Sequence, residues 1–249
     1  MHISLGVACL ARGRLRVSEQ HLERALEAST CSGWLGGEAD AVTQLSAIHL
    51  RAGDVSEAIV LGRRAIRLYR QHKHLSGEAM AHAVLGYSYW LFGDLPQALR
   101  YQKRALALHE QAGNEYGQAT CLTELATPLH DKGDHACAEL DYLAAVAICE
   151  RLGAPARLVQ ALAGLSRVQS CAGYPVDALR NAQRAVAVAY QSRDRRAESS
   201  ALDAMARALR APPPRRGTRV RREGALGRRA RRAPLGHRRC PDRLGVPLS

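Results

Sequence analysis

The chain has 249 residues, of which 47% are hydrophobic and only 4% are aromatic, and its formal net charge is +13. This length and apolar content allow a sizeable core and exclude a wholly disordered protein. No uninterrupted run of 18 apolar residues occurs, so we expect no membrane span. The first arginines follow the N-terminal apolar stretch instead of preceding it, which is the wrong order for a secretory signal.

An internal repeat extends from the N-terminus to about residue 210. Five glycines recur at a constant period of 40, namely Gly13, Gly53, Gly93, Gly133 and Gly173. A leucine lies eight positions before each of these glycines, and an alanine lies twelve positions after each of them. Five copies in register do not arise by chance, and a fixed period of this length is typical of a solenoid. We therefore assign residues 1–210 to an array of five repeats with a partial sixth helix.

Each repeat is predicted to contain two helices. The first helix carries the repeat leucine with a small residue beside it, as in Leu85-Gly86, which lets two helices approach closely. A Gly-Asp turn then leads into the second helix, and Asp54, Asp94 and Asp134 are the expected N-caps. In the second repeat, small and apolar residues at helical spacing mark the buried stripe of that second helix: Ala58, Gly62, Ala65, Ile66 and Tyr69.

The two ends of the array depart from the pattern. Met1 falls four positions before Leu5, inside the first expected helix, so we expect a fragment or a misassigned start. At the other end, Met205 occupies the position of the repeat leucine, but Pro213 stands where the repeat predicts a glycine. We therefore expect the partial sixth helix to end near residue 210.

Residues 211–249 differ sharply from the rest of the chain. They contain 12 arginines, six of the ten prolines and no aromatic residue, and Glu223 and Asp242 are their acidic residues, so they carry +10 of the net charge of +13. We expect a disordered basic tail with no packed structure. It is either a frameshifted reading of a GC-rich gene or a genuine segment that contacts phosphate groups.

The seven cysteines form no C-x-x-C pair, and their number is odd and their spacing irregular. This pattern argues against a disulfide framework and against a zinc site. We expect a reduced chain in the cytoplasm.

The third repeat resembles the tetratricopeptide repeat (TPR) most clearly, because it reads Leu85-Gly86-x-x-Tyr89-x-x-x-Gly93-Asp94-x-x-x-Ala98. The usual TPR period is about 34 residues, whereas this period of 40 is similar to that of kinesin light chains and of many bacterial regulators. The resemblance implies an all-α, right-handed α-solenoid of antiparallel helix pairs, a TPR superhelix. With 33 arginines against 3 lysines, the array also resembles the C-terminal TPR region of actinobacterial SARP and MalT-like transcriptional regulators.

No catalytic motif accompanies the repeat. The chain contains no G-x-S-x-G sequence, no G-x-x-x-x-G-K-[ST] loop and no acidic pair beyond the expected helix caps. His130, Asp131, Asp134 and His135 cluster around a turn, but Asp134 is already explained as a cap. We predict neither an enzyme nor a metal or cofactor site.

The TPR resemblance implies that the first helix of each repeat lines a concave groove. Groove positions lie two and five positions on either side of the repeat leucine. The candidate partner-binding residues at these positions are Met80, Tyr87, Trp90, Thr123, Thr127, His130, Arg167 and Arg207. Aromatic residues and arginine are the types that anchor interfaces. Packing between repeats is an equal alternative for Trp90.

We therefore predict a protein-interaction scaffold that binds a peptide or helix of an unidentified partner in this groove. The resemblance implies the regulatory part of a bacterial transcriptional regulator. The alternative is a nucleic-acid-associated protein that uses residues 211–249. The uncapped end helices could also support self-association.

Overall fold

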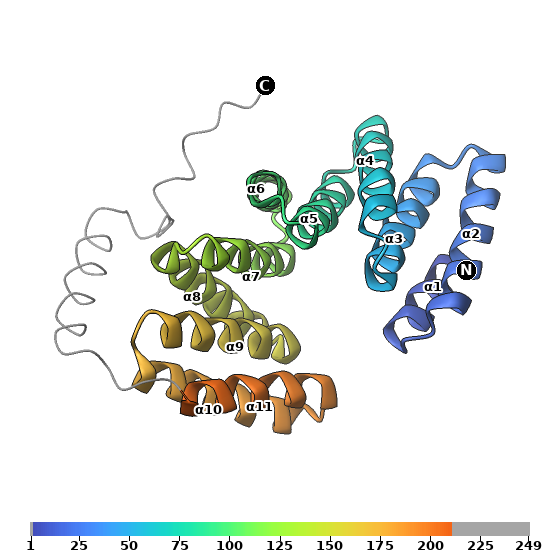
Figure 1. Ribbon diagram of the computed structural model, residues 1–249. Helices are drawn as coiled ribbons and strands as arrows, with labels where there is room; N and C mark the ends of the chain where they lie inside the picture. The colour runs from blue at the N-terminus through green and yellow to red at the C-terminus, as the bar shows by residue number, and fades with distance from the viewer. Residues whose placement is uncertain (1, 211–249) are drawn as a thin grey trace. The chain divides into compact units, whose positions relative to one another are not determined.

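The computed structural model describes residues 2–210 and shows helices with no strand in that range (Figure 1). The predicted basic tail, residues 211–249, lies outside the described residues. The helices, in chain order, are α1 (His2–Ala11), α2 (Leu15–Ser32), α3 (Leu35–Ala52), α4 (Val55–Gln71), α5 (Leu75–Phe92), α6 (Leu95–Gln111), α7 (Glu115–Asp131), α8 (His135–Leu152), α9 (Pro155–Cys171), α10 (Pro175–Ser192) and α11 (Arg195–Arg210). The predicted all-α fold class is confirmed.

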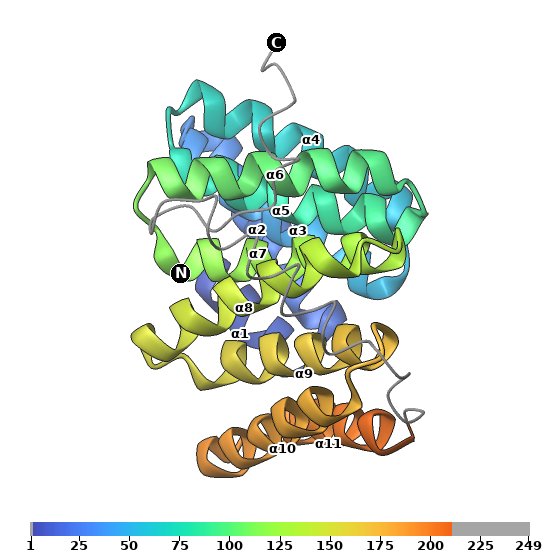
Figure 2. The ribbon, with the colours of Figure 1, turned by 90° about the vertical axis from the view of Figure 1, so that its left-hand side faces the viewer.

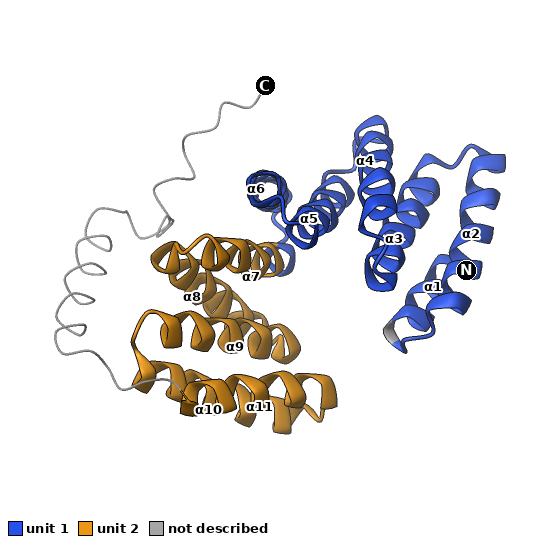
Figure 3. Ribbon diagram, viewed as in Figure 1, with its two compact units in different colours: residues 1–117 blue, residues 118–249 orange. Residues whose placement is uncertain are grey.

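The chain divides into two compact units (Figure 3). Unit 1 ends at Gly117 and unit 2 begins at Gln118, so the boundary falls inside α7. In unit 1, consecutive helices from α1 to α6 pack on one another, with the most extensive contacts between α5 and α6. In unit 2, consecutive helices from α8 to α11 do the same, as the view in Figure 2 shows. Each unit is thus a stack of helix pairs with mainly local contacts.

The first helices of successive repeats also contact one another. In unit 1, α3 packs against both α1 and α5, and in unit 2 α9 packs against α11. Second helices such as α4 and α6, or α8 and α10, make no comparable contact within residues 2–210. Within each unit the first helices therefore lie closer together, which places them on the inner side of the stack. We call the surface of α1, α3 and α5 in unit 1, and of α7, α9 and α11 in unit 2, the inner face.

The turns between helices follow a spacing of half a repeat. A residue with positive φ occurs at every twentieth position, namely at 13, 33, 53, 73, 93, 113, 133, 153, 173 and 193. Eight of these ten residues are glycines, and the other two are Lys73 (φ 56°) and Arg193 (φ 53°). Glycine adopts this left-handed conformation at little steric cost, whereas residues with a side chain do not. Both helices of each repeat therefore end in the same kind of left-handed turn.

The predicted helix caps are confirmed. The Oδ1 atoms of Asp54, Asp94 and Asp134 each accept a hydrogen bond from the backbone N–H three positions later, at 3.1 Å. The half-repeat positions carry caps of other types, because His74 accepts from Gly77 at 3.2 Å and Asn114 accepts from Gly117 at 2.9 Å. These bonds satisfy backbone donors that a helix N-terminus otherwise leaves unpaired.

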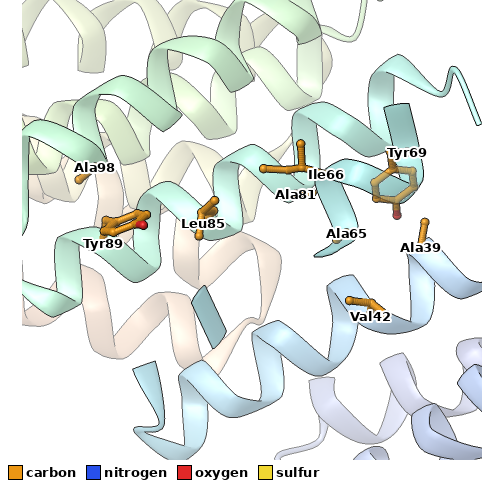
Figure 4. Packing of buried hydrophobic residues seen from close by; sticks show 9 residues of the cluster. All are labelled: Ala39, Val42, Ala65, Ile66, Tyr69, Ala81, Leu85, Tyr89 and Ala98. Carbon is orange, nitrogen blue, oxygen red and sulfur yellow. The ribbon is translucent and has the colours of Figure 1, made fainter. Parts of the chain in front are cut away.

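The hydrophobic core is made of the repeat leucines and many alanines. Leu85, Leu125 and Leu165 are buried. In unit 1, one cluster joins α3, α4, α5 and α6 (Figure 4) through Ala39, Val42, Ala65, Ile66, Tyr69, Ala81, Leu85, Tyr89 and Ala98. In unit 2, the contact between α10 and α11 consists mainly of alanines: Ala178, Ala182, Ala204 and Ala208. Small side chains allow these helix axes to approach closely.

The small residue beside each repeat leucine has the expected role. A Cβ atom at Gly86 would lie 2.9 Å from the Gln102 side chain, which is closer than real contacts allow. Where serine takes this position, its hydroxyl bonds to the facing helix, as from Ser166 Oγ to the Ala178 carbonyl oxygen at 2.8 Å. The position therefore sets the distance between the two helices of a repeat.

Two chemical features of the described residues complete the fold. None of the helices in residues 2–210 has the length and apolar character needed to cross a membrane. Cys9, Cys31, Cys149 and Cys171 are free thiols.

Candidate binding surface

In unit 1, the predicted groove residues of α5 present an apolar surface. Met80 and Tyr87 are 36% and 39% exposed, and the Tyr87 and Trp90 rings lie 5.3 Å apart between centroids. Trp90 is partly buried and packs against the unit 1 core, so the alternative of core packing holds for part of its surface. Tyr89, predicted to be a core residue, is buried. The exposed aromatic surface on the inner face therefore consists mainly of Tyr87, with Met80 two turns earlier on the same helix.

The charged groups near the inner face of unit 1 are paired within the chain. Arg64 Nη2 lies 2.6 Å from Glu38 Oε1, which joins α4 to α3. Arg70 Nε lies 2.9 Å from Glu78 Oε1, which joins α4 to α5. These contacts neutralise the acidic side chains at the N-terminal ends of α3 and α5 and leave them little affinity for a ligand.

Hydroxyl groups in unit 1 complete this internal network. Tyr69 Oη donates a hydrogen bond to Asp40 Oδ1 at 2.6 Å, and burial raises the pKa of Tyr69 far above its ordinary value of 10. Arg63 donates to the Tyr89 hydroxyl and lies over the ring of the same tyrosine. The Tyr89 ring in turn stacks on Tyr101, with ring centroids 5.3 Å apart and an interplanar angle of 5°.

A buried histidine lies behind this surface. His82 is only 4% exposed, and neither of its ring nitrogens has a hydrogen-bond partner among the described residues. Its Nε2 lies 3.5 Å from Glu78 Oε1 without forming a hydrogen bond. Burial lowers the pKa of His82 to about 4, although the Glu78 carboxylate acts in the opposite direction. His82 is therefore neutral at neutral pH.

In unit 2, three side chains meet where α7, α8 and α9 adjoin. Thr127 Oγ1 lies 3.0 Å from the hydroxyl of Tyr142, and Arg167 Nη2 donates to the same hydroxyl at 3.5 Å. Tyr142 is buried, and it brings together two predicted groove residues that lie one full repeat apart in the sequence. We call Thr127, Tyr142 and Arg167 the arginine site.

His130 lies beside the arginine site. Its Nδ1 is 3.0 Å from Nδ1 of His135, and its Nε2 is 4.0 Å from the sulfur of Cys171. Burial lowers the pKa of His130, and the neighbouring charges of Arg167 and His135 lower it further. Within residues 2–210, no group of three or more His, Cys, Asp or Glu side chains is arranged to hold a metal ion.

The remaining predicted groove residues have partners that limit their availability. The Thr123 hydroxyl donates to the Ala119 carbonyl oxygen in its own helix at 2.9 Å. Arg207 is exposed and forms an ion pair with Asp203 one turn earlier on α11, at 2.8 Å. Neither residue joins the arginine site through a hydrogen bond, and a role in binding for all eight residues remains a prediction.

Sequence analysis did not identify His82, which lies behind the inner face of unit 1, or Tyr142, which belongs to the arginine site of unit 2. Tyr142 lies 40 positions after Gln102 and 80 after Gly62, so its position in the repeat holds no characteristic residue. His82 takes a position that is Val42, Leu122 and Leu162 in other repeats. A polar residue at such an apolar position is the signal that could have identified it.

A family model described as the tetratricopeptide repeat matches residues 81–112. No curated protein sequence matches the chain significantly. Solved structures with the same fold do match. BtubC (BKLC) from P. vanneervenii is 18% identical, with a TM-score of 0.61, over 82% of this chain and 96% of that one.

Two further matches are a Rap protein and a signal transduction ATPase. A Rap protein complexed with Competence and Sporulation Factor is 14% identical, with a TM-score of 0.71, over 91% of this chain and 67% of that one. A signal transduction ATPase of the STAND class with a tetratricopeptide repeat sensor, from Pyrococcus horikoshii, is 16% identical, with a TM-score of 0.66, over 91% of this chain and 35% of that one. At these identities the likeness shows the fold, which is that of a TPR protein.

Proposed function

We propose that this chain is a protein-interaction module whose inner face binds an extended peptide or a helix of a partner protein. The observation that carries the proposal is the contact between the first helices of successive repeats, α1, α3 and α5 in unit 1 and α9 and α11 in unit 2. It supports an inner face that is made of first helices, on which the predicted groove positions lie. Helix pairs that cannot bury their apolar stripes alone stack into a long surface of this kind. Such a surface suits recognition of an extended segment.

The side chains on the inner face support binding better than catalysis. In unit 1, exposed Met80 and Tyr87 offer apolar contact area, and in unit 2 Arg167 offers an anchoring cation. Aromatic residues and arginine contribute most to binding energy at interfaces. His130 is the predicted groove residue with a lowered pKa, and its ring nitrogens contact His135 and the sulfur of Cys171.

We further propose that the module is the regulatory part of a bacterial transcriptional regulator in the cytoplasm. Structural similarity to a Rap protein complexed with Competence and Sporulation Factor, and to a STAND-class ATPase with a TPR sensor, supports a sensing role. The alternative, a nucleic-acid-associated protein, depends on residues 211–249, which lie outside the described residues. A steep salt dependence of DNA binding would favour that alternative.

The test is selection of binding peptides with the full chain from a random peptide library. We expect selected peptides to lose affinity about 10-fold for the Tyr87→Ala variant, because truncating an anchoring aromatic removes on the order of 1.4 kcal/mol or more. Val60→Ala is the matched control, since Val60 is exposed on α4, a second helix. Equal loss in both variants, or failure to select any peptide, would contradict the proposed binding surface.

A further inference from the structure

We infer that the arginine site of unit 2 binds a carboxylate side chain of the partner, so that the inner face of this unit selects an acidic peptide. This inference rests on the proposed function and names the chemistry of its ligand. Three observations support it: the absence of a counter-ion among the described residues, the way in which Arg167 is held, and the lack of acidic groups at the neighbouring groove positions.

Arg167 has no acidic partner in the part of the chain that the structure describes. Within residues 2–210, no carboxylate lies within 4.0 Å of its guanidinium nitrogens, whereas Arg64, Arg70, Arg184 and Arg207 each have one. The guanidinium has five N–H donors, and only one of them, on Nη2, has a partner. The Nε atom is buried without any hydrogen-bond partner. A half-buried cation in this condition is destabilising until an anion reaches it.

A chain of hydroxyl groups lies behind Arg167 and contacts its guanidinium at the limit of hydrogen-bond distance. The Thr127 hydroxyl is 3.4 Å from the Thr123 carbonyl oxygen, to which it can donate, so its oxygen accepts from the Tyr142 hydroxyl at 3.0 Å. The lone pairs of the Tyr142 oxygen are then available to accept from Arg167 Nη2 at 3.5 Å. Tyr142 therefore acts as a positioning residue, and the N–H groups of Arg167 on Nη1 and the second N–H on Nη2 are left to a ligand, whereas Nε is buried.

The surroundings of the site favour one negative charge. The groove positions of α7 and α9 contain no acidic residue, since they are Thr120, Thr123, Thr127, His130, Gln160, Ala163, Arg167 and Ser170. His130 has a lowered pKa and adds no second positive charge at neutral pH. One guanidinium matches one carboxylate in charge and, with its planar fork, in geometry. A phosphate group would require a further cation.

The experiment compares two short fluorescein-labelled peptides, one of alternating Glu and Ala and one of alternating Gln and Ala, by fluorescence anisotropy at physiological salt. We expect the full chain to bind the Glu peptide about 10-fold more tightly, and Arg167→Gln to remove that difference. Arg167→Lys should be intermediate because lysine lacks the fork. Arg180→Gln is the matched control, because Arg180 is an exposed arginine on α10, a second helix that lies outside the inner face. All variants keep residues 211–249, so binding by that segment is common to them.

A second measurement reports the site directly. In a ¹H–¹⁵N spectrum, the Arg167 Nε–Hε signal, identified by its absence in Arg167→Lys, should move when the Glu peptide is added. Where Arg167→Gln lowers thermal stability, Tyr142→Phe provides the test, with an expected loss of about three-fold in Glu-peptide affinity.

Several outcomes separate this inference from the proposed function. Equal binding of the Glu and Gln peptides, or an Arg167→Gln variant that keeps the preference for Glu, overturns the acidic ligand and leaves the interaction module intact. A phosphoserine peptide that binds more tightly than the Glu peptide through Arg167 overturns the assignment to a carboxylate. Failure to select any peptide from the random library counts against the module itself.

Discussion

In unit 1, the charged groups next to the inner face are matched inside the chain, whereas in unit 2 the described residues place no carboxylate beside the cation of Arg167. Both units have a buried tyrosine on a second helix and a threonine on the first helix that contacts its hydroxyl. In unit 1 the acid that completes the group is Asp40, and the arginine site of unit 2 contains no equivalent acid within residues 2–210.

If the proposed function holds, similar helix pairs serve stability in one place and recognition in another. An internal ion pair of moderate exposure contributes little net free energy, but it removes both charges from competition for ligands. An unmatched guanidinium lowers stability slightly and keeps its hydrogen-bonding capacity for a partner. The repeat backbone is common to both units, so the distinction depends on single side chains.

The largest expected effect on the free energy of unfolding tests whether unit 1 and unit 2 unfold independently. Leu85→Ala in unit 1 and Leu165→Ala in unit 2 should each lower the free energy of unfolding by about 3 kcal/mol, because both leucines are buried. Both tryptophans, Trp34 and Trp90, lie in unit 1, so their fluorescence reports its unfolding.

We expect Leu85→Ala to lower the fluorescence midpoint in urea more than Leu165→Ala does, and hydrogen exchange to show the reverse in α8 to α10. Equal shifts of the fluorescence midpoint in the two variants would show that unit 1 and unit 2 unfold as one cooperative body.

The next effect concerns pH and is confined to unit 1. Burial lowers the pKa of His82 to about 4, from 6.5 in the unfolded chain, so the unfolded state binds more protons between these values. The stability from neutral His82 is fully present above pH 6.5 and is lost as the pH falls towards 4, by about 2–3 kcal/mol.

His82→Leu is the comparison, since leucine occupies this repeat position at Leu122 and Leu162. Urea unfolding followed by tryptophan fluorescence from pH 7 to 4.5 should show a shallower loss of stability in the variant. If the variant showed the same pH dependence of stability as the natural chain, titration of His82 would not be its cause.

Removing a tyrosine hydroxyl should lower the free energy of unfolding more in unit 1 than in unit 2, and the difference should be smaller than the effects above. Tyr69→Phe leaves the Asp40 carboxylate without its donor at 2.6 Å and should lower stability by about 2 kcal/mol. Tyr142→Phe removes contacts with Thr127 and, at the limit of hydrogen-bond distance, with Arg167, and should lower stability by about 1 kcal/mol. The reverse order, measured by denaturant unfolding of both variants, would contradict the internal pairing in unit 1.

The smallest effect is expected to be a gain in stability, with one site in each unit. Lys73→Gly and Arg193→Gly should each raise the free energy of unfolding by about 0.5 kcal/mol, because left-handed backbone is unfavourable for residues with a side chain. Part of the gain is offset by the greater freedom of glycine in the unfolded chain.

Gly113→Ala and Gly153→Ala are the matched controls, and both should lower the free energy of unfolding. Thermal unfolding by circular dichroism is sufficient to rank the four variants. A loss of stability in Lys73→Gly would mean that the lysine side chain makes a contact worth more than the strain in its backbone.

The repeat and its fold could be predicted from the sequence because their signals are local. The Gly13 to Gly173 series and the Asp54 type of cap act on the backbone within a few positions, and the structure confirms the caps. The left-handed turns at Lys73 and Arg193 could not be predicted, because neither residue type favours this conformation, and His74 is not a typical N-cap residue.

The contacts between repeats could not be predicted in the same way. Tyr142 meets Arg167 through the packing of α8 against α9. No other repeat has a tyrosine at the Tyr142 position, and arginine recurs at the Arg167 position only in the partial sixth repeat, as Arg207. A groove position gives the direction of a side chain, but its charge balance depends on what neighbouring helices supply. This is why Arg167 was identified as a groove residue while its lack of a counter-ion was not.

The regular turn at each half-repeat has a consequence for how such a chain can change length. Any two turns that are one full repeat apart have the same backbone conformation, so recombination between their codons would add or remove one helix pair and leave every other junction as it was. The number of helix pairs, and with it the length of the inner face, can then change independently of the side chains that this face carries. The arginine site, which is built from parts of two adjacent pairs, would persist through such changes only if both pairs were inherited together.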